Sequence, residues 1–229
     1  MSKARDETRL AALQKHRLYV VEDHPVTRQG FAQLINFEPD LHVCGQAGSA
    51  AQALAEIPVA KPHLVVVDIS LGGTSGLQLI KDIITRDGAV PILVLSTYDE
   101  TLYAERALRA GAKGYVMKHA PTEEVMKAIR RVLRGGVYLS ERMQTRLVGM
   151  VAGGRPAVSA SDVERLSDRE LEVFTLIGQG RSTTQIGAAL HVSGSTVATH
   201  RVHIKEKLEL ENTRELVRRA VAWVQSHDF

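Results

Sequence analysis

The chain has 229 residues and a formal net charge of +3, with 44% hydrophobic and 24% charged residues. This composition can form buried cores and excludes a wholly disordered chain. The 4% content of aromatic residues argues against single-stranded nucleic-acid binding through stacked rings. The single cysteine, Cys44, excludes an internal disulfide and a zinc site built from several cysteines.

The sequence carries no apolar run of the roughly 18 residues that a membrane-spanning helix needs. Residues 1–17 are charged throughout and lack the apolar centre of a signal peptide. We therefore expect a cytoplasmic protein without a membrane partner, in which residues 1–16 form a mobile extension. Residues 130–160 have a net charge of +5, but a basic run is usually a solvated face and does not by itself indicate nucleic-acid binding.

Short apolar segments alternate with helical patterns over the first two-thirds of the chain. The predicted strands are Leu18–Val21, Leu41–Cys44, Leu64–Val67, Ile92–Leu95 and Tyr115–Met117. Helical patterns follow them, among them Ala50–Glu56, Leu77–Thr85, Thr101–Ala110 and Glu123–Leu133. Five apolar strands that alternate with helices predict an α/β fold, in which a five-stranded doubly wound parallel sheet is covered by helices on both faces.

Polar side chains stand where the predicted strands end, and this is the edge at which such sheets bind ligands. Glu22 and Asp23 follow the first strand, Asp68 follows the third, Ser96 the fourth and Lys118 the fifth. Clustered carboxylates repel one another, and a hard divalent cation such as Mg²⁺ relieves that repulsion with oxygen ligands. The set therefore predicts Mg²⁺-assisted phosphoryl chemistry on one carboxylate, with the amine facing the anion.

Four segments resemble the signature segments of receiver domains of two-component response regulators: VVEDHPVTRQGF, LVVVDISLGGTSG, ILVLST and GAKGYVMK. The resemblance implies that Asp68 is the phosphoacceptor and that Mg²⁺ is held by Glu22, Asp23, Asp68 and the backbone carbonyl of Ser70. It also implies that Ser96 and Lys118 contact the phosphoryl oxygens and that Tyr115 is the switch aromatic. Gly72 stands where the family usually has proline, which predicts a looser loop.

The last third of the chain has the pattern of a small helical domain. Ser167 and Glu170 form a predicted capping box at the start of one helix, which Gly180 ends. A short helix at Thr183–Leu190, a turn of small residues and a third helix follow, which is the helix-turn-helix arrangement. On the third helix, Val197, Ile204 and Leu208 share the side predicted to be buried. From the pattern alone, a protein-binding helical bundle remains an alternative.

The segment LSDRELEVFTLIGQGRSTTQIGAALHVSGSTVATHRVHIKEKLEL resembles the LuxR-type helix-turn-helix of NarL/FixJ-family response regulators. The resemblance implies that Ala198, Thr199 and Val202 face base edges. It further implies phosphate contacts from Arg181, Ser182, Thr183, Ser195, Thr196, Arg201 and Lys205. Because the first base-facing position often holds lysine in that family, the uncharged Ala198 predicts weak binding to each half-site and a dependence on dimer formation.

These patterns together predict a phosphorylation-controlled transcription factor rather than an enzyme. The expected divisions are a receiver domain at 17–137, a linker at 138–162 and a DNA-binding domain at 163–229. The expected partners are a sensor histidine kinase, double-stranded promoter DNA, a second copy of the chain and RNA polymerase.

Two other functions share some of these features. A Mg²⁺-dependent phosphotransfer or phosphatase enzyme with a helical accessory domain is the main alternative, but it commonly has an acid two residues after the nucleophile, where this chain has Ser70. In a flavin-binding module, the cofactor phosphate would meet Glu22 and Asp23. His24 follows this acidic pair, but it is not expected to be a ligand because Mg²⁺ prefers oxygen.

Overall fold

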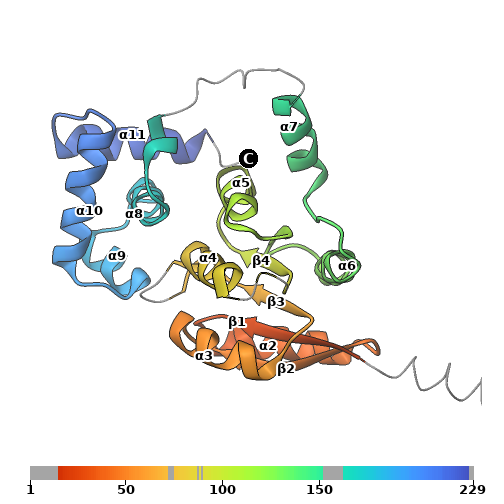
Figure 1. Cartoon of the computed structure of the whole chain (residues 1–229). Coiled ribbons are helices and arrows are strands. Elements are labelled where there is room, and N and C mark those ends of the chain that lie inside the picture. Colours follow the sequence, from red (N-terminus) through yellow and green to blue (C-terminus); the bar gives the residue numbers. More distant parts are fainter. Residues whose placement is uncertain (1–14, 72–74, 87, 89, 152–161, 227–229) are drawn as a thin grey trace, which may run out of the picture. The chain divides into compact units, whose positions relative to one another are not determined.

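The computed structural model describes residues 15–71, 75–86, 88, 90–151 and 162–226 (Figure 1). The chain divides into an N-terminal unit, Met1–Ser140, and a C-terminal unit, Glu141–Phe229. The extension predicted for residues 1–16 falls largely outside the described residues, as do Gly72 and most of the second half of the predicted linker. Within the described part of the chain, no helix is both long and apolar enough to cross a bilayer.

The N-terminal unit is a five-stranded parallel sheet in the order β2-β1-β3-β4-β5, which confirms the predicted fold class. Its strands are β1 (His16–Val21), β2 (Leu41–Ala47), β3 (Leu64–Val67), β4 (Ile92–Ser96) and β5 (Gly114–Met117). Its helices are α2 (Pro25–Phe37), α3 (Ala50–Ala60), α4 (Gly76–Arg86), α5 (Glu100–Ala110) and α6 (Thr122–Leu133). Every crossover therefore brings the next strand back in the same direction, so all five carboxyl ends lie at one edge.

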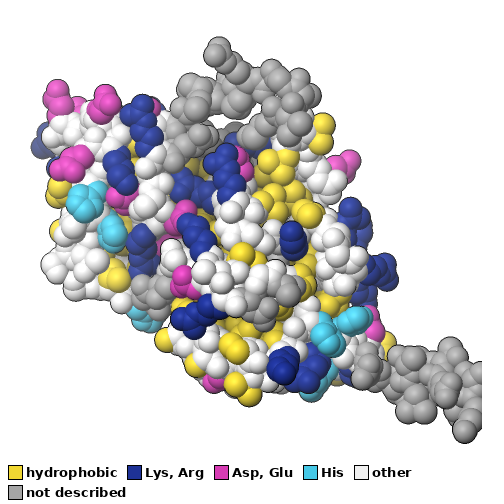
Figure 2. All heavy atoms as spheres, in the orientation of Figure 1, with side chains coloured by type: hydrophobic (Ala, Val, Ile, Leu, Met, Phe, Trp, Pro, Cys, Tyr) yellow, Lys and Arg dark blue, Asp and Glu magenta, His cyan; other side chains and the backbone are white. Residues whose placement is uncertain are grey.

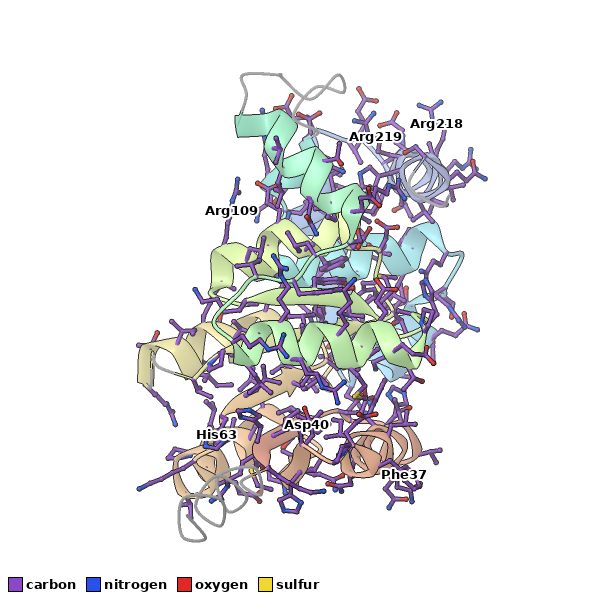
Figure 3. All side chains as sticks on the ribbon, turned by 90° about the vertical axis from the view of Figure 1, so that its right-hand side faces the viewer. Phe37, Asp40, His63, Arg109, Arg218 and Arg219 are labelled. Carbon is purple, nitrogen blue, oxygen red and sulfur yellow. The ribbon has the colours of Figure 1, made fainter. Side chains whose placement is uncertain are left out.

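Helices cover both faces of this sheet. On one face, alternate strand residues such as Leu18 and Val66 pack with the buried sides of α2 and α6. On the other face, α4 packs between α3 and α5. Arg130 of α6 also pairs with Glu38 and Asp40 beyond the end of α2, at 2.5 and 2.7 Å (Asp40 is labelled in Figure 3). These layers hold the strand ends in place from both sides.

The second strand is longer than the sequence pattern predicts. It runs to Ala47 because Gly45 leaves room for the ring of Tyr19 on β1. A Cβ atom at position 45 would collide with that ring. The β1–β2 register shifts by one residue between Leu18 and Tyr19, next to this contact. The two strands therefore stay paired beyond the irregularity.

The segment predicted as a linker, 138–162, differs from a simple connection. Tyr138 makes a parallel β-bridge to Gly114 at the edge of the N-terminal sheet, so the ordered unit continues past residue 137. Glu141–Val151 form helix α7, which the sequence pattern did not predict, and Asp162–Arg165 form a short 3₁₀ helix. Gly149 inside α7 weakens the helical pattern, because glycine is an unfavourable residue in a helix interior.

The C-terminal unit contains four further helices: α8 (Asp168–Gly178), α9 (Thr183–Leu190), α10 (Gly194–Lys207) and α11 (Thr213–Gln225). The predicted capping box of Ser167 and Glu170 is present, and Ser182 and Gln185 form a second one. The first helix ends at Gly178, two residues before the predicted Gly180, which takes a left-handed φ of +79°. Phe174 and Trp223 pack edge to face in the core, with ring centroids 5.4 Å apart.

Candidate functional site

Polar groups follow directly from the strand ends of the N-terminal unit. Glu22 and Asp68 come one residue after β1 and β3, Ser96 is the last residue of β4, and Lys118 comes one residue after β5. Glu22, Asp68 and Ser96 are 2%, 3% and 0% exposed, which is unusual for such residues. The structure thus brings the predicted groups to one edge and withdraws them from bulk water.

Lys118 joins the two buried carboxylates. Its Nζ atom lies 2.5 Å from Oε2 of Glu22 and 2.8 Å from Oδ2 of Asp68. Burial lowers the pKa of Lys118, but Asp68 and Glu22 outweigh this effect and raise the pKa above its usual value. The amine therefore stays charged and partly neutralises two carboxylates on different strands.

Asp68 is the most perturbed acid of this edge. Burial raises its pKa to about 6, an effect that the charge of Lys118 opposes and the charge of Glu22 reinforces. Its Oδ1 atom is buried without a hydrogen-bond partner among the described residues, while Oδ2 accepts from Lys118. A Cβ atom on Gly76 would collide with the carbonyl oxygen of Asp68, so only glycine allows α4 to start this close. A lone pair on Oδ1 that no described side chain occupies is what a nucleophile or a metal ligand requires.

The acidic pair after β1 lies against His24. The Nδ1 atom of His24 is 2.7 Å from Oδ1 of Asp23 and 3.1 Å from Oε1 of Glu22. Ligand atoms of these three residues lie within 4.8 Å of one another. Arg28 donates to the backbone carbonyl of Glu22 at 2.6 Å and holds this turn. Arg28 was not among the predicted site residues, because its place in the first turn of α2 is its only sequence signal for a role at this edge.

Oxygen ligands for a hard cation are present at this edge. Ligand atoms of Glu22 and Asp23 lie within 4.8 Å of each other, and Asp68, which shares Lys118 with Glu22, supplies a further carboxylate at this edge. Carboxylate oxygens are the kind of donor that Mg²⁺ takes. Ser70 lies two residues after Asp68 and is partly buried, and a role for its carbonyl stays a prediction. The residues that are present therefore fit the predicted ion.

Ser96 and Tyr115 both form hydrogen bonds with the backbone of Tyr98. The Tyr115 hydroxyl donates to the carbonyl of Tyr98 at 2.6 Å, and Ser96 Oγ accepts from the Tyr98 backbone N–H at 3.1 Å. Burial raises the pKa of Tyr115 well above its usual value, while a hydrogen bond with Ser96 acts in the opposite direction. Tyr115 is only 1% exposed, so the predicted switch residue lies in an inward position.

The predicted DNA-binding residues lie on α9 and α10 and in the turn before α9. Val197 and Ile204 of α10 are fully buried and Leu208 nearly so, as the helical pattern predicts. The opposite side of the helix exposes Ser195, Thr196, Ala198, Thr199 and Val202. Arg181 and Ser182 are also exposed, whereas Thr183, Arg201 and Lys205 are partly buried. The exposed side of the recognition helix therefore offers hydroxyl and methyl groups in place of charges.

Several of these residues hold one another in position. Arg201 donates to the Thr183 hydroxyl at 3.2 Å and so joins α10 to the start of α9. Ser193 caps α10 by accepting from the Thr196 N–H, and its hydroxyl lies 2.7 Å from that of Ser195. Figure 2 shows basic side chains in small groups interspersed with acidic ones, so charge alone does not mark a DNA-binding face in that view.

Ion pairs that the sequence pattern did not predict support α9 and α10 from α8. Arg169 pairs with the fully buried Glu172 at 2.6 Å and donates to the carbonyl of Leu190 at 2.7 Å. Lys207 pairs with Glu170 at 2.6 Å. Their only sequence signal is charge on a helix whose neighbours are apolar.

Comparisons with known proteins agree with this geometry. Residues 18–130 match the family described as the response regulator receiver domain, and residues 164–220 match the luxR family of bacterial regulatory proteins. The chain is 37% identical over 209 residues to the oxygen regulatory protein NreC of Staphylococcus carnosus, and 35% identical to that of Staphylococcus haemolyticus. Both alignments cover 90% of this chain and 96% of the relative.

Solved structures show the same fold. A LuxR-family two-component response regulator from an Aurantimonas species is 30% identical, with a TM-score of 0.57, and the match covers 61% of this chain and 99% of that one. RcsB from Salmonella enterica serovar Typhimurium, solved bound to the promoter rprA with the phosphomimetic BeF₃⁻, is 23% identical. Its TM-score is 0.60, and the match covers 90% of this chain and 98% of that one.

A buried acidic edge on a parallel sheet, followed by a helix-turn-helix, defines a phosphorylation-controlled, DNA-binding regulator of transcription. The chain belongs to the NarL/FixJ type of response regulators, in which a receiver domain is joined to a LuxR-type DNA-binding domain. A receiver domain has a histidine kinase as its partner, and a LuxR-type domain binds DNA.

Proposed function

We propose that Asp68 is the residue that accepts the phosphoryl group. One observation carries this assignment: Lys118 bridges Asp68 and Glu22 at the carboxyl edge of the sheet, while no described side chain donates to the second oxygen of Asp68. In the transfer, Oδ1 of Asp68 forms a bond to phosphorus as the bond between phosphorus and the kinase histidine nitrogen breaks. Lys118 is then placed to contact the transferred oxygens, and Ser96 at the end of β4 is the proposed second contact.

We also propose that Glu22, Asp23, Asp68 and the Ser70 carbonyl hold Mg²⁺. The ion, when bound, would offset the negative charge of the transferred group. The chain's own part is to keep these oxygens together: Arg28 fixes the turn that carries Glu22, and Lys118 prevents the carboxylates from repelling one another. His24 is 68% exposed and contacts both acids, which supports a role in orienting them rather than in ligating the ion.

The function that follows is control of transcription by phosphorylation, not turnover of a substrate. A phosphatase commonly has an acid two residues after its nucleophile, and this chain has Ser70 there. The proposed partners are a sensor histidine kinase, promoter DNA, a second copy of the chain and RNA polymerase, in the cytoplasm. The exposed face of α10 supports dimer formation on DNA, because its base-facing residues are uncharged and make few strong contacts, and two helices reach half-sites about 34 Å apart.

The test combines phosphorylation and DNA binding. Wild-type protein incubated with acetyl phosphate and Mg²⁺ should gain one phosphoryl group that is labile to base and to hydroxylamine, as an acyl phosphate is, and should bind promoter DNA more tightly. Asp68→Asn should gain neither, whereas the matched variant Asp82→Asn, on the outer part of α4, should behave as wild type. Chelation of Mg²⁺ should suppress labelling of the wild type. Full labelling of Asp68→Asn would refute the assignment.

A further inference from the structure

The chain does not leave the receiver domain directly after α6. Gly135, with a left-handed φ of +82°, turns the chain back, and residues 137–140 then run beside β5. The Tyr115 N–H donates to the Tyr138 carbonyl at 3.0 Å, and the Tyr138 N–H donates to the Lys113 carbonyl at 2.9 Å. We call residues 137–140 the exit segment. Its backbone is therefore paired with the strand that carries the switch residue.

Side chains of the exit segment bind two other elements of the same domain. The Tyr138 hydroxyl donates to Oε1 of Glu124 on α6 at 2.9 Å, and the Ser140 hydroxyl donates to Oε1 of Glu100 at 2.5 Å. Tyr138 and Leu139 are only 8% and 6% exposed, although this segment follows the last helix of the domain. The exit segment is thus held by specific contacts and is not a loose connection.

Glu100 joins this segment to the β4–α5 loop, which follows Ser96. It is the first residue of α5 and lies four residues after Ser96 and two after Tyr98, whose carbonyl accepts from Tyr115. A cavity of about 280 Å³ beside Tyr115 is lined by Glu100, Glu124 and Ser140, so these groups have room to rearrange. Movement of Ser96 or Tyr115 would therefore change both the backbone and the side-chain contacts of residues 138–140.

We propose that Ser140 and Tyr138 are positioning residues that transmit the state of Asp68 to the DNA-binding domain, through the hydrogen bonds to Glu100 and Glu124. The inference rests on the proposed function of Asp68. Ser140 immediately precedes α7, the first element of the C-terminal unit, so a shift of the exit segment passes into the connecting chain through covalent bonds. Because these contacts are present with Tyr115 inward, they stabilise that state and favour the response to phosphorylation.

The experiment compares Ser140→Ala and Tyr138→Phe with wild type and with Thr145→Ala in the full-length chain. Thr145 is a matched control because its hydroxyl donates only within its own helix, to the Glu141 carbonyl. The DNA probe is a fragment selected by the wild-type protein from a random-sequence duplex library. Three quantities are measured: phosphate occupancy of Asp68 with acetyl phosphate, affinity for this fragment without phosphorylation, and the gain in affinity at matched occupancy.

Ser140→Ala and Tyr138→Phe should each reduce the phosphorylation-dependent gain by roughly three- to tenfold, the effect of losing one such hydrogen bond. Occupancy and basal affinity should stay at wild-type values, and Ser140→Thr, which keeps the hydroxyl, should restore the gain. The losses of gain in Ser140→Ala and Glu100→Ala should not add when the two substitutions are combined, because both remove the same hydrogen bond.

Two results would overturn the inference while leaving the proposed function intact. One is a phosphorylation-dependent gain in DNA affinity that stays at the wild-type value in both single variants. The other is a loss of basal DNA affinity as large as the loss of that gain, which indicates a merely structural role. A wild-type protein that is not labelled at Asp68, or that shows no gain, would instead refute the proposed function and this inference with it.

Discussion

The two functional regions of this protein use opposite chemistry. At the edge of the sheet, charged groups are buried: Glu22 and Asp68 are 2% and 3% exposed and share one lysine. On α10, the surface proposed to contact bases is exposed and uncharged, and Val202 is 46% exposed. Charge inside an apolar sheet is costly and needs a functional reason, whereas small residues on an exposed helix are ordinary. A phosphoacceptor is therefore conspicuous in a sequence, and a DNA-contacting surface of this type is not.

The largest effect is expected from removing the shared cation. Lys118→Met leaves two buried carboxylates without their counter-charge, which should lower the free energy of unfolding of the receiver domain by about 3–5 kcal/mol. Lys113→Met, on an exposed lysine just before β5, should change it by less than about 0.5 kcal/mol. Urea unfolding without Mg²⁺ measures both, and added Mg²⁺ should recover part of the loss. Equal effects of the two variants would show that the buried charges are not what distinguishes this region.

A smaller effect is expected on the DNA-binding side. Arg201→Ala should weaken DNA binding by about tenfold for all sequences and lower the slope of log affinity against log salt by about one, because one phosphate contact is lost. Arg218→Ala, on the exposed side of α11 (Figure 3), should leave the slope unchanged. Binding titrations at several salt concentrations measure the slope. An unchanged slope for Arg201→Ala would mean that its contact with Thr183 is its only role.

The caps of the helical domain should contribute less than the buried charges of the receiver. Ser167→Ala removes one half of the capping box of α8 and should destabilise the C-terminal unit by about 1 kcal/mol. Ser167→Asp keeps an acceptor for the Glu170 N–H and should retain most of that stability. Thermal unfolding of the two variants beside wild type makes the comparison. Equal losses would contradict a role for the side-chain acceptor.

The smallest effect expected is a pH dependence of the helical domain. Burial lowers the pKa of His200 below its usual value of 6.5, and the charges of Arg169 and His203 act in the same direction while Glu170 opposes them. The unfolded chain therefore binds a proton more readily, and stability should fall as the pH decreases from about 6.5 toward the folded-state pKa. Denaturation at about pH 7.5 and about pH 5.5 should show that stability declines less on acidification in His200→Gln than in wild type, with His42→Gln, an exposed histidine of β2 in the other unit, as the control. A wild-type stability that rises on acidification would contradict the sign.

Most of the receiver site was predictable because its signal is local. A strand that ends in Glu22 or Asp68 places that residue at the carboxyl edge in any parallel sheet, so identity and position follow from the apolar runs. The predicted capping box at Ser167 is local for the same reason. Helix α7 and the exit segment were not predicted, because Gly149 weakens the first pattern and the second is a short stretch that pairs with a strand more than 20 residues earlier.

The sequence by itself determined which residue types stand at the strand ends, which side of α10 is buried and where most of the helices begin. Only the tertiary structure decided that Lys118 contacts both Glu22 and Asp68, residues 96 and 50 positions away, in preference to solvent. It also decided that Tyr115 points inward to the Tyr98 carbonyl and that Ser140 reaches Glu100. Residue order sets backbone propensity and the alternation of apolar groups, which act over a few residues. The direction of a long polar side chain depends on the partners that other elements bring to it, and those elements assemble only when the whole sheet and its helices pack.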